Sequence, residues 1–107
     1  KTMILTSNGQ NIYPEEIEAK LNNMPFVSES LVIQRDNHLV ALVYPDYDAV
    51  DRMGLAVSEL PTTMENIRLE LNKIVAPYEK IEKITLMPTE FEKTPKRSIK
   101  RYLYQPK

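Results

Sequence analysis

Two β-rich runs follow each other in residues 27–44, VSESLVIQRDNHLVALVY. Asp36-Asn37 separates them, and a two-residue connection of this composition is typical of a β-hairpin. At their centres, in residues 31–33 and 39–43, the runs are apolar at consecutive positions. A strand with two apolar faces must be covered on both sides. We therefore expect this hairpin to form the centre of a sheet.

The residues before this hairpin predict a second, smaller hairpin and a helix. Asn8-Gly9 is a strong turn signal because both residues tolerate positive φ, so residues 1–13 are expected to form a small hairpin with a polar loop. Pro14 suits the first position of a helix, and Ile17, Leu21 and Met24 give that helix an apolar stripe.

The residues after residue 44 predict one more helix, one more strand and a short last helix. Residues 45–60 indicate a loop with one helical turn. Thr62 and Glu65 fit a capping box at the start of a helix that continues to Val75 and ends at Pro77. Residues 81–87 predict a third strand, and Ser98 is expected to cap the last helix. The order predicts an α+β fold, in which a small N-terminal hairpin is followed by a three-stranded sheet with helices packed on it.

The composition excludes several classes of site. The chain has 107 residues, 42% of them hydrophobic, and a net charge of −1, as expected for one compact domain. Without cysteine and with a single histidine, it offers no disulfide, thiolate or multi-histidine metal site, so no metal site of its own is expected. Two isolated glycines do not make a phosphate loop. The absence of cysteine fits a reducing cytoplasm, and no signal peptide or membrane-spanning run is visible. The start at Lys1 suggests a piece of a larger protein.

Charge divides the chain into an acidic body and a basic tail. Residues 91–107 hold six basic residues and one acid, a formal charge of +5, whereas residues 1–90 hold eight basic residues and 14 acids, a formal charge of −6. The tail is open to three interpretations: a solvated terminus, a nucleic-acid patch, or a set of cations for one small phosphate ligand. The acidic body opposes binding of a long polyanion, which favours the third over the second.

The turn Ser7-Asn8-Gly9-Gln10-Asn11 is rich in hydroxyl and amide donors. It is either a plain hairpin loop or a place where a ligand chain approaches the backbone closely, as glycine permits.

Two stretches carry a resemblance to a known family. KTMI at residues 1–4 with SNGQNIYPEEIE at residues 7–18 is similar to a G-R-x-[DK]-x-x-I stretch that leads into G-x-x-I-x-P-x-E-I-E. KTPKRSIKR at residues 93–101 is similar to a closing motif K-T-x-x-G-K-[IV]-x-R. Both patterns belong to the AMP-forming acyl-CoA synthetases, and the resemblance covers the whole chain.

The resemblance implies that residues 1–107 are the C-terminal lid domain of such a ligase, with hinge and hairpin at 1–13 and the closing motif at 91–107. The family makes an acyl-adenylate from a carboxylic acid, here expected to be a fatty acid, and ATP with Mg²⁺, and then transfers the acyl group to coenzyme A (CoA). The implied partner is the N-terminal adenylation domain of the same chain, and the fragment alone is expected to be inactive. Lys1 would be the hinge. The implied CoA-binding residues are Ser7, Asn8, Gly9, Gln10 and Asn11.

The closing motif departs from the family at two positions. Ser98 stands where the family has its adenylation lysine, and Arg97 stands where glycine is usual. Serine carries no positive charge, so Lys100, or failing that Lys96, is expected to act in its place; on a helix these two lysines would share a face. A second hypothesis concerns a different class of protein: a stand-alone binding module that uses its basic tail on RNA or on a protein partner.

Overall fold

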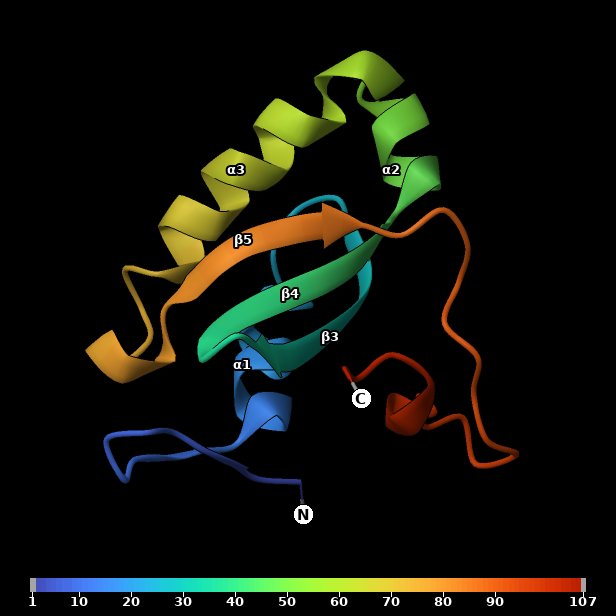
Figure 1. Cartoon of the computed structure of the whole chain (residues 1–107). Helices are drawn as coiled ribbons and strands as arrows, with labels where there is room; N and C mark the ends of the chain where they lie inside the picture. The colour runs from blue at the N-terminus through green and yellow to red at the C-terminus, as the bar shows by residue number, and fades with distance from the viewer. Residues whose placement is uncertain (1, 107) are drawn as a thin grey trace.

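The structure, a computed structural model, describes residues 2–106 and has the predicted α+β architecture (Figure 1). A two-stranded antiparallel hairpin comes first, formed by β1 (Ile4–Leu5) and β2 (Asn11–Ile12). Helix α1 (Pro14–Leu21) then leads into the main sheet. The sheet has the order β3-β4-β5, with β3 (Val27–Arg35) antiparallel to β4 (His38–Pro45) and β4 parallel to β5 (Ile81–Leu86).

The long hairpin forms as predicted. Arg35 pairs with His38, and Asp36 and Asn37 have φ of 52° and 65°, the two positive values that a tight two-residue turn requires. The expectation that both strands lie at the centre of the sheet was half right. β4 is central, whereas β3 is an edge strand whose two faces are nevertheless covered.

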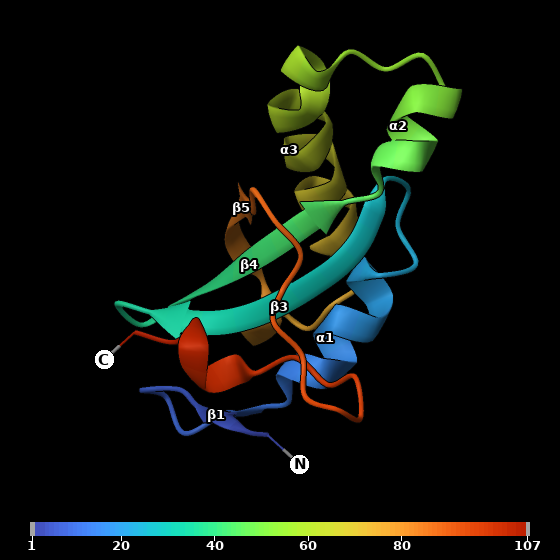
Figure 2. The same ribbon diagram turned by 90° about the vertical axis from the view of Figure 1, so that its right-hand side faces the viewer.

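The two faces of the sheet are covered by different parts of the chain. Helices α1 and α3 (Leu60–Leu71) pack on one face. Phe91 and the residues after it cover the other, where Phe91 is only 3% exposed and meets Tyr104 edge-on, with ring centroids 5.0 Å apart. Figure 2 shows this last part of the chain crossing the sheet on the side of β3. Within the described residues, Phe91, Ile99 and Tyr104 therefore pack the basic tail against the sheet, although its charged loop is exposed.

Both predicted boundaries of the second long helix were wrong, and the expected last helix does not form. Helix α3 begins at Leu60, with no side-chain cap at its N-cap residue Glu59, so Thr62 and Glu65 do not form a capping box. It ends at Leu71, and Ile74 beyond it is exposed. The residues before it hold a short helix, α2 (Tyr47–Arg52), whose start is capped by Asp46. The expected last helix is only a 3-10 turn, Arg101–Leu103, which Ser98 does not cap.

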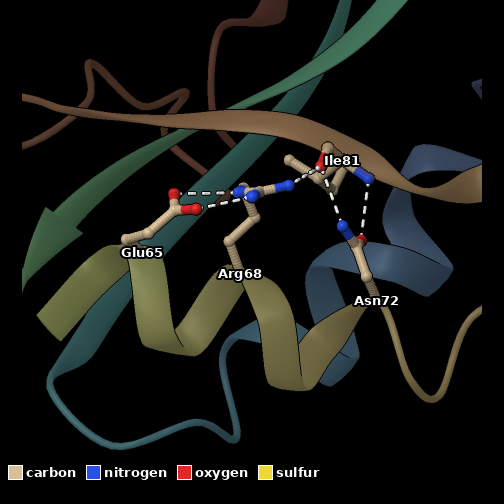
Figure 3. A network of polar contacts seen from close by, with 4 residues as sticks. All are labelled: Glu65, Arg68, Asn72 and Ile81. Atoms are coloured by element: carbon tan, nitrogen blue, oxygen red, sulfur yellow. Dashed lines mark hydrogen bonds and ion pairs between the residues drawn. The ribbon is translucent and has the colours of Figure 1, made fainter. Parts of the chain in front are cut away.

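A side-chain network joins the end of α3 to the start of β5 (Figure 3). The side chain of Asn72 accepts a hydrogen bond from the backbone N–H of Ile81 at 2.8 Å and donates one to its carbonyl at 2.9 Å. Arg68 donates to the same carbonyl at 3.0 Å, and two further nitrogens of its guanidinium bind Glu65. Asn72 thus satisfies both backbone groups of a residue that is 1% exposed.

Asn72→Ala should lower the free energy of unfolding of the 107-residue chain by about 2 kcal/mol. The buried N–H of Ile81 is then left without an acceptor, while its carbonyl keeps Arg68, and an unsatisfied buried group costs about 1–3 kcal/mol. Urea unfolding followed by circular dichroism measures the change. Asn66→Ala, on the exposed side of the same helix, is the control and should change it by less than about 0.5 kcal/mol. Equal effects of the two substitutions would show that the Ile81 contacts do not stabilise the fold.

Candidate functional site

The loop of the N-terminal hairpin is closed by its own backbone. Gly9 N–H donates to the Thr6 carbonyl and Thr6 N–H to the Gln10 carbonyl, both at 3.0 Å, and the Thr6 hydroxyl accepts from Gln10 N–H at 3.0 Å. Gly9 has a φ of +81°, and an added Cβ there would meet nothing within 4 Å. The glycine therefore serves the turn conformation and leaves open space above the backbone.

The structure brings the five predicted CoA-binding residues together on this loop. All five are exposed, and within residues 2–106 none of their side chains makes a hydrogen bond or ion pair. They are Ser7, Asn8, Gly9, Gln10 and Asn11. The loop thus offers unused polar groups to a ligand. The predicted hinge, Lys1, lies outside the described residues.

Residues 92–100 form a second, larger loop, which we call the closing loop. Lys93 pairs with Ile99 in an isolated antiparallel β-bridge. Thr94 N–H donates to the Ser98 carbonyl at 2.8 Å, and Lys100 N–H donates to the Glu92 carbonyl at 2.9 Å. Because no helix spans this segment, the expectation that Lys96 and Lys100 share a helical face was wrong. Lys96 is exposed at the tip of the loop, and Lys100 is half-buried at its base.

The backbone at Arg97 has a conformation that glycine adopts more easily, which agrees with the glycine of the motif that residues 93–101 resemble. The φ of Arg97 is +67°, in the left-handed region, and its N–H donates to the Thr94 carbonyl at 2.8 Å to close the tip. For a residue with a Cβ this conformation costs about 1–2 kcal/mol. The loop therefore keeps a glycine-type backbone although the glycine is absent. Ser98, next to Arg97, is exposed.

The five described cations of the tail fall into two groups. Lys93 pairs with Glu29 at 2.5 Å, and Arg101 pairs with Glu18, so both are used to hold the tail against the body. In the part of the chain that the structure describes, the side chains of Lys96, Arg97 and Lys100 have no such partner. These three cations are the ones left for an anionic ligand.

Glu18 is the residue of this region that the sequence did not reveal. The sequence indicates only that Glu18, with Glu15 and Glu16, belongs to a helix start. In the structure Glu18 is 7% exposed, and its carboxylate accepts three hydrogen bonds. Its Oε2 accepts from Val32 N–H at 2.7 Å and from Arg101 Nη1 at 2.9 Å, and its Oε1 accepts from Arg101 Nη2. Burial raises the pKa of the Glu18 carboxyl, although the bonds from Arg101 and Val32 oppose the rise. Glu18 and Arg101 both lie in the quoted motifs, but their pairing over 83 residues is a tertiary contact.

The two loops lie at the same end of the domain and point to opposite sides of it. In Figure 1 the loop between β1 and β2 extends to one side below the sheet and the closing loop to the other, and Figure 2 also shows them apart. Within residues 2–106, no group of three acidic or histidine side chains is placed to hold a metal ion, and no helix is long and apolar enough to cross a membrane. The described surface therefore offers a polar loop on one side and a cationic loop on the other.

Residues 1–105 match the family described as the AMP-binding enzyme C-terminal domain. The chain belongs to this family. A search of curated protein sequences found no match. The resemblance seen in the hairpin and closing motifs is thereby confirmed along nearly the whole chain.

Solved structures of longer enzymes contain the same fold. An acyl-CoA synthetase from Brucella canis is 26% identical with a TM-score of 0.72, over 94% of this chain and 18% of that one. The adenylation domain of a carboxylate reductase from Mycobacterium chelonae is 17% identical with a TM-score of 0.78, over 94% of this chain and 17% of that one. A fatty acyl CoA synthetase from Mycobacterium tuberculosis is 22% identical with a TM-score of 0.66, over 97% of this chain and 20% of that one. The chain thus spans about a fifth of the length of the structures it matches.

Arg97→Gly should stabilise the 107-residue chain by about 0.5–1 kcal/mol. Glycine removes the left-handed strain at this position, and its greater freedom in the unfolded chain offsets part of the gain. Thermal unfolding should show a rise in Tm of about 2–6 °C. Arg35→Gly is the control, because Arg35 is also exposed and adjoins a turn but has no positive φ, and it should destabilise the chain. A fall in Tm for Arg97→Gly would contradict the strain at the loop tip.

Arg101→Leu should destabilise the chain by about 2–3 kcal/mol at pH 7, because it leaves the buried Glu18 carboxylate without its counter-charge. Without Arg101 the pKa of Glu18 rises further in the folded state, so the folded chain binds the proton more tightly than the unfolded chain. The unfolding free energy of the variant then falls as pH rises above about 4.5, the ordinary pKa of the group. The deficit relative to the wild type should therefore shrink when the pH is lowered from 7 towards 5.

Urea unfolding at pH 5, 6 and 7 measures this dependence. Lys96→Leu is the matched control, because it removes an exposed, unpaired cation from the closing loop, which precedes Arg101, and should have little effect at any of the three pH values. A deficit for Arg101→Leu that does not change with pH would mean that Glu18 is not the group left uncompensated.

Proposed function

We propose that the chain is the C-terminal domain of an ATP-dependent, AMP-forming acyl-CoA ligase whose acid substrate is a fatty acid. The observation that carries the proposal is the pair of exposed loops at one end of the domain, one with unused polar groups and one with unpaired cations. Membership of the family supports the nucleotide part of the proposal, and the Brucella canis acyl-CoA synthetase, at 26% identity, supports the CoA part.

In the proposed reaction the carboxylate oxygen of the acid attacks the α-phosphorus of ATP, and pyrophosphate leaves. The thiol of CoA then attacks the acyl carbon, loses its proton, and displaces AMP. Because the chain is about a fifth of the length of the matched enzymes, the ATP, Mg²⁺ and acid sites are assigned mainly to a preceding adenylation domain. The fragment by itself would not catalyse either step.

The two loops would serve different steps. The closing loop would meet the nucleotide during adenylation, when a cation can stabilise the charge that develops on the phosphoryl and carboxyl oxygens. The hairpin loop would line the path of the CoA thiol, where the open space over Gly9 leaves room for a narrow chain. Rotation about a hinge at Lys1 would exchange the two loops, since they point to opposite sides of the domain.

Lys100 is the better candidate for the adenylation cation than Lys96. Its backbone is fixed by the hydrogen bond to the Glu92 carbonyl and it adjoins the anchored Arg101, whereas Lys96 lies at the exposed tip. A charge held on a fixed backbone stabilises a transition state more than a mobile one does, because it needs no rearrangement during the reaction. Ser98 has no charge to offer. Three free cations on one loop also give few contacts to a long phosphate backbone, which leaves the RNA-binding alternative with less support.

Lys100→Ala, made in the full-length ligase, should lower the rate of acyl-adenylate formation by about 100-fold. Thioester formation from supplied acyl-adenylate should change less than twofold, because the closing loop then faces away from the reaction. Pyrophosphate exchange measures the first step and release of AMP in the presence of CoA measures the second, with fatty acids of graded chain length as substrates.

Lys96→Ala is the matched control and should lower adenylation by less than about threefold. Unchanged adenylation in the Lys100→Ala variant would remove Lys100 from the mechanism. Absence of fatty-acid-dependent pyrophosphate exchange in the wild-type enzyme would overturn the proposed function itself.

A further inference from the structure

The closing loop is anchored to the body of the domain at both of its ends. At its start, Glu29 accepts a hydrogen bond from Phe91 N–H at 3.3 Å and pairs with Lys93 at 2.5 Å. At its end, Glu18 binds the guanidinium of Arg101 through both carboxylate oxygens. Both carboxylates come from the part of the fold that carries the sheet and α1, so the loop is held by charge at its two ends and is free at its tip.

Glu18 is placed to control the end of the loop that bears Lys100. Arg101 follows Lys100 directly in the sequence, and its two bonds to Glu18 fix the direction of the guanidinium as well as its distance. Glu18 is fixed in turn by the bond from Val32 N–H of β3. The backbone of Lys100 is therefore set between the Glu92 carbonyl on one side and the Glu18–Arg101 pair on the other.

The same contact links the two loops of the site. Glu18 lies on α1, which follows β2 of the N-terminal hairpin after a single residue. Arg101 begins the 3-10 turn that follows the closing loop. The Glu18–Arg101 pair thus joins α1, which follows the Gly9 loop, to the 3-10 turn that follows the closing loop. It therefore fixes the position of each loop relative to the other.

Stability alone does not account for this arrangement. The side chains of Glu18 and Arg101 are 9% and 19% exposed, and taking two charges out of water offsets much of their attraction. A bidentate pair with a third bond from the backbone gives a defined geometry instead.

We propose that Glu18 is a positioning residue for adenylation, which holds Arg101 so that the neighbouring Lys100 meets the reacting phosphoryl and carboxyl oxygens. The inference rests on the proposed function and on the assignment of Lys100. Glu18 itself touches neither substrate, because its two oxygens are occupied by Arg101 and Val32. Its effect should therefore pass entirely through the position of Lys100.

Glu18→Gln in the full-length ligase tests the inference, because glutamine keeps the volume but presents an NH₂ group either to Arg101 or to Val32 N–H. The turnover number for adenylation should fall at least tenfold, while the KM for ATP and thioester formation from supplied acyl-adenylate each change less than twofold. In the Lys100→Ala background the same substitution should cause no further loss of adenylation, since residues that act as a unit are not additive. Glu90→Gln, an exposed acid near the start of the tail, should leave all of these values unchanged.

Amide hydrogen exchange on the 107-residue chain gives a readout independent of activity, since the chain has its own closed core. Glu18→Gln should raise exchange about tenfold at Lys100 and Leu103, whose N–H groups bond within and after the closing loop. Exchange at Leu42, in the middle of β4, should not change. If Glu18→Gln does not fold, the double variant Glu18→Gln/Arg101→Gln removes both charges and should show the same kinetic pattern.

The outcomes separate the two proposals. Adenylation that falls in Lys100→Ala but not in Glu18→Gln would overturn the positioning role and leave the proposed function standing. Equal losses in both half-reactions, or loss of protection at Leu42, would make Glu18 a structural residue only and would overturn the inference. A wild-type enzyme without adenylation activity would remove both proposals together.

Discussion

The fold depends on burying both faces of the sheet that β3, β4 and β5 form. Alternate residues of the hairpin contribute to two separate core clusters, with Val32 and Val43 on the side of the helices and Leu31 and Leu42 on the other. Helices α1 and α3 can cover only one of these faces. The second face is covered by the end of the chain, through Phe91 and its contact with Tyr104. A basic segment that could have been a mobile tail is thereby tied to the core, and the loop it carries acquires a fixed base.

The sequence predicted those elements whose signals are local. Asp36-Asn37, Asn8-Gly9 and Pro14 determine a turn or a helix start by their own backbone preferences, and the structure confirms all three. The boundaries that failed depend on competition between neighbouring signals. Thr62 could have capped a helix, but Leu60 is 2% exposed, and burying it extends the helix to Leu60, where the N-cap residue Glu59 makes no side-chain cap. Burial of an apolar side chain contributes about 1.5–3 kcal/mol, more than the roughly 1 kcal/mol of a typical cap.

The exposed residues of the candidate site could be predicted from the sequence, but the ion pairs that hold the tail against the body of the domain could not. The polar residues of the hairpin loop and the cations of the tail could be named from the sequence because turn residues and charges are expected at the surface. Which cations are free could not, since Lys93 and Arg101 look the same as Lys96 and Lys100 until their partners are known. The partners, Glu29 and Glu18, lie more than 60 residues away, and a carboxylate in the first turns of a helix is normally explained by the helix dipole alone.

The closing loop keeps the backbone conformation of the motif it resembles, but it does not carry a positive charge at Ser98. Arg97 adopts the left-handed backbone that glycine would take more easily, and the hydrogen bonds of Thr94 hold that shape in spite of the strain. The loop can therefore form without glycine at position 97, but glycine there would remove the backbone strain. Charge is different, because no rearrangement of the backbone gives a serine hydroxyl a positive charge. In the proposed mechanism a neighbouring cation on a fixed backbone takes the role that the resemblance assigns to a lysine at the position of Ser98, and the contacts of Glu92 and Arg101 give Lys100 such a backbone. The role proposed for Lys100 therefore depends on the contacts that anchor the tail to the rest of the domain.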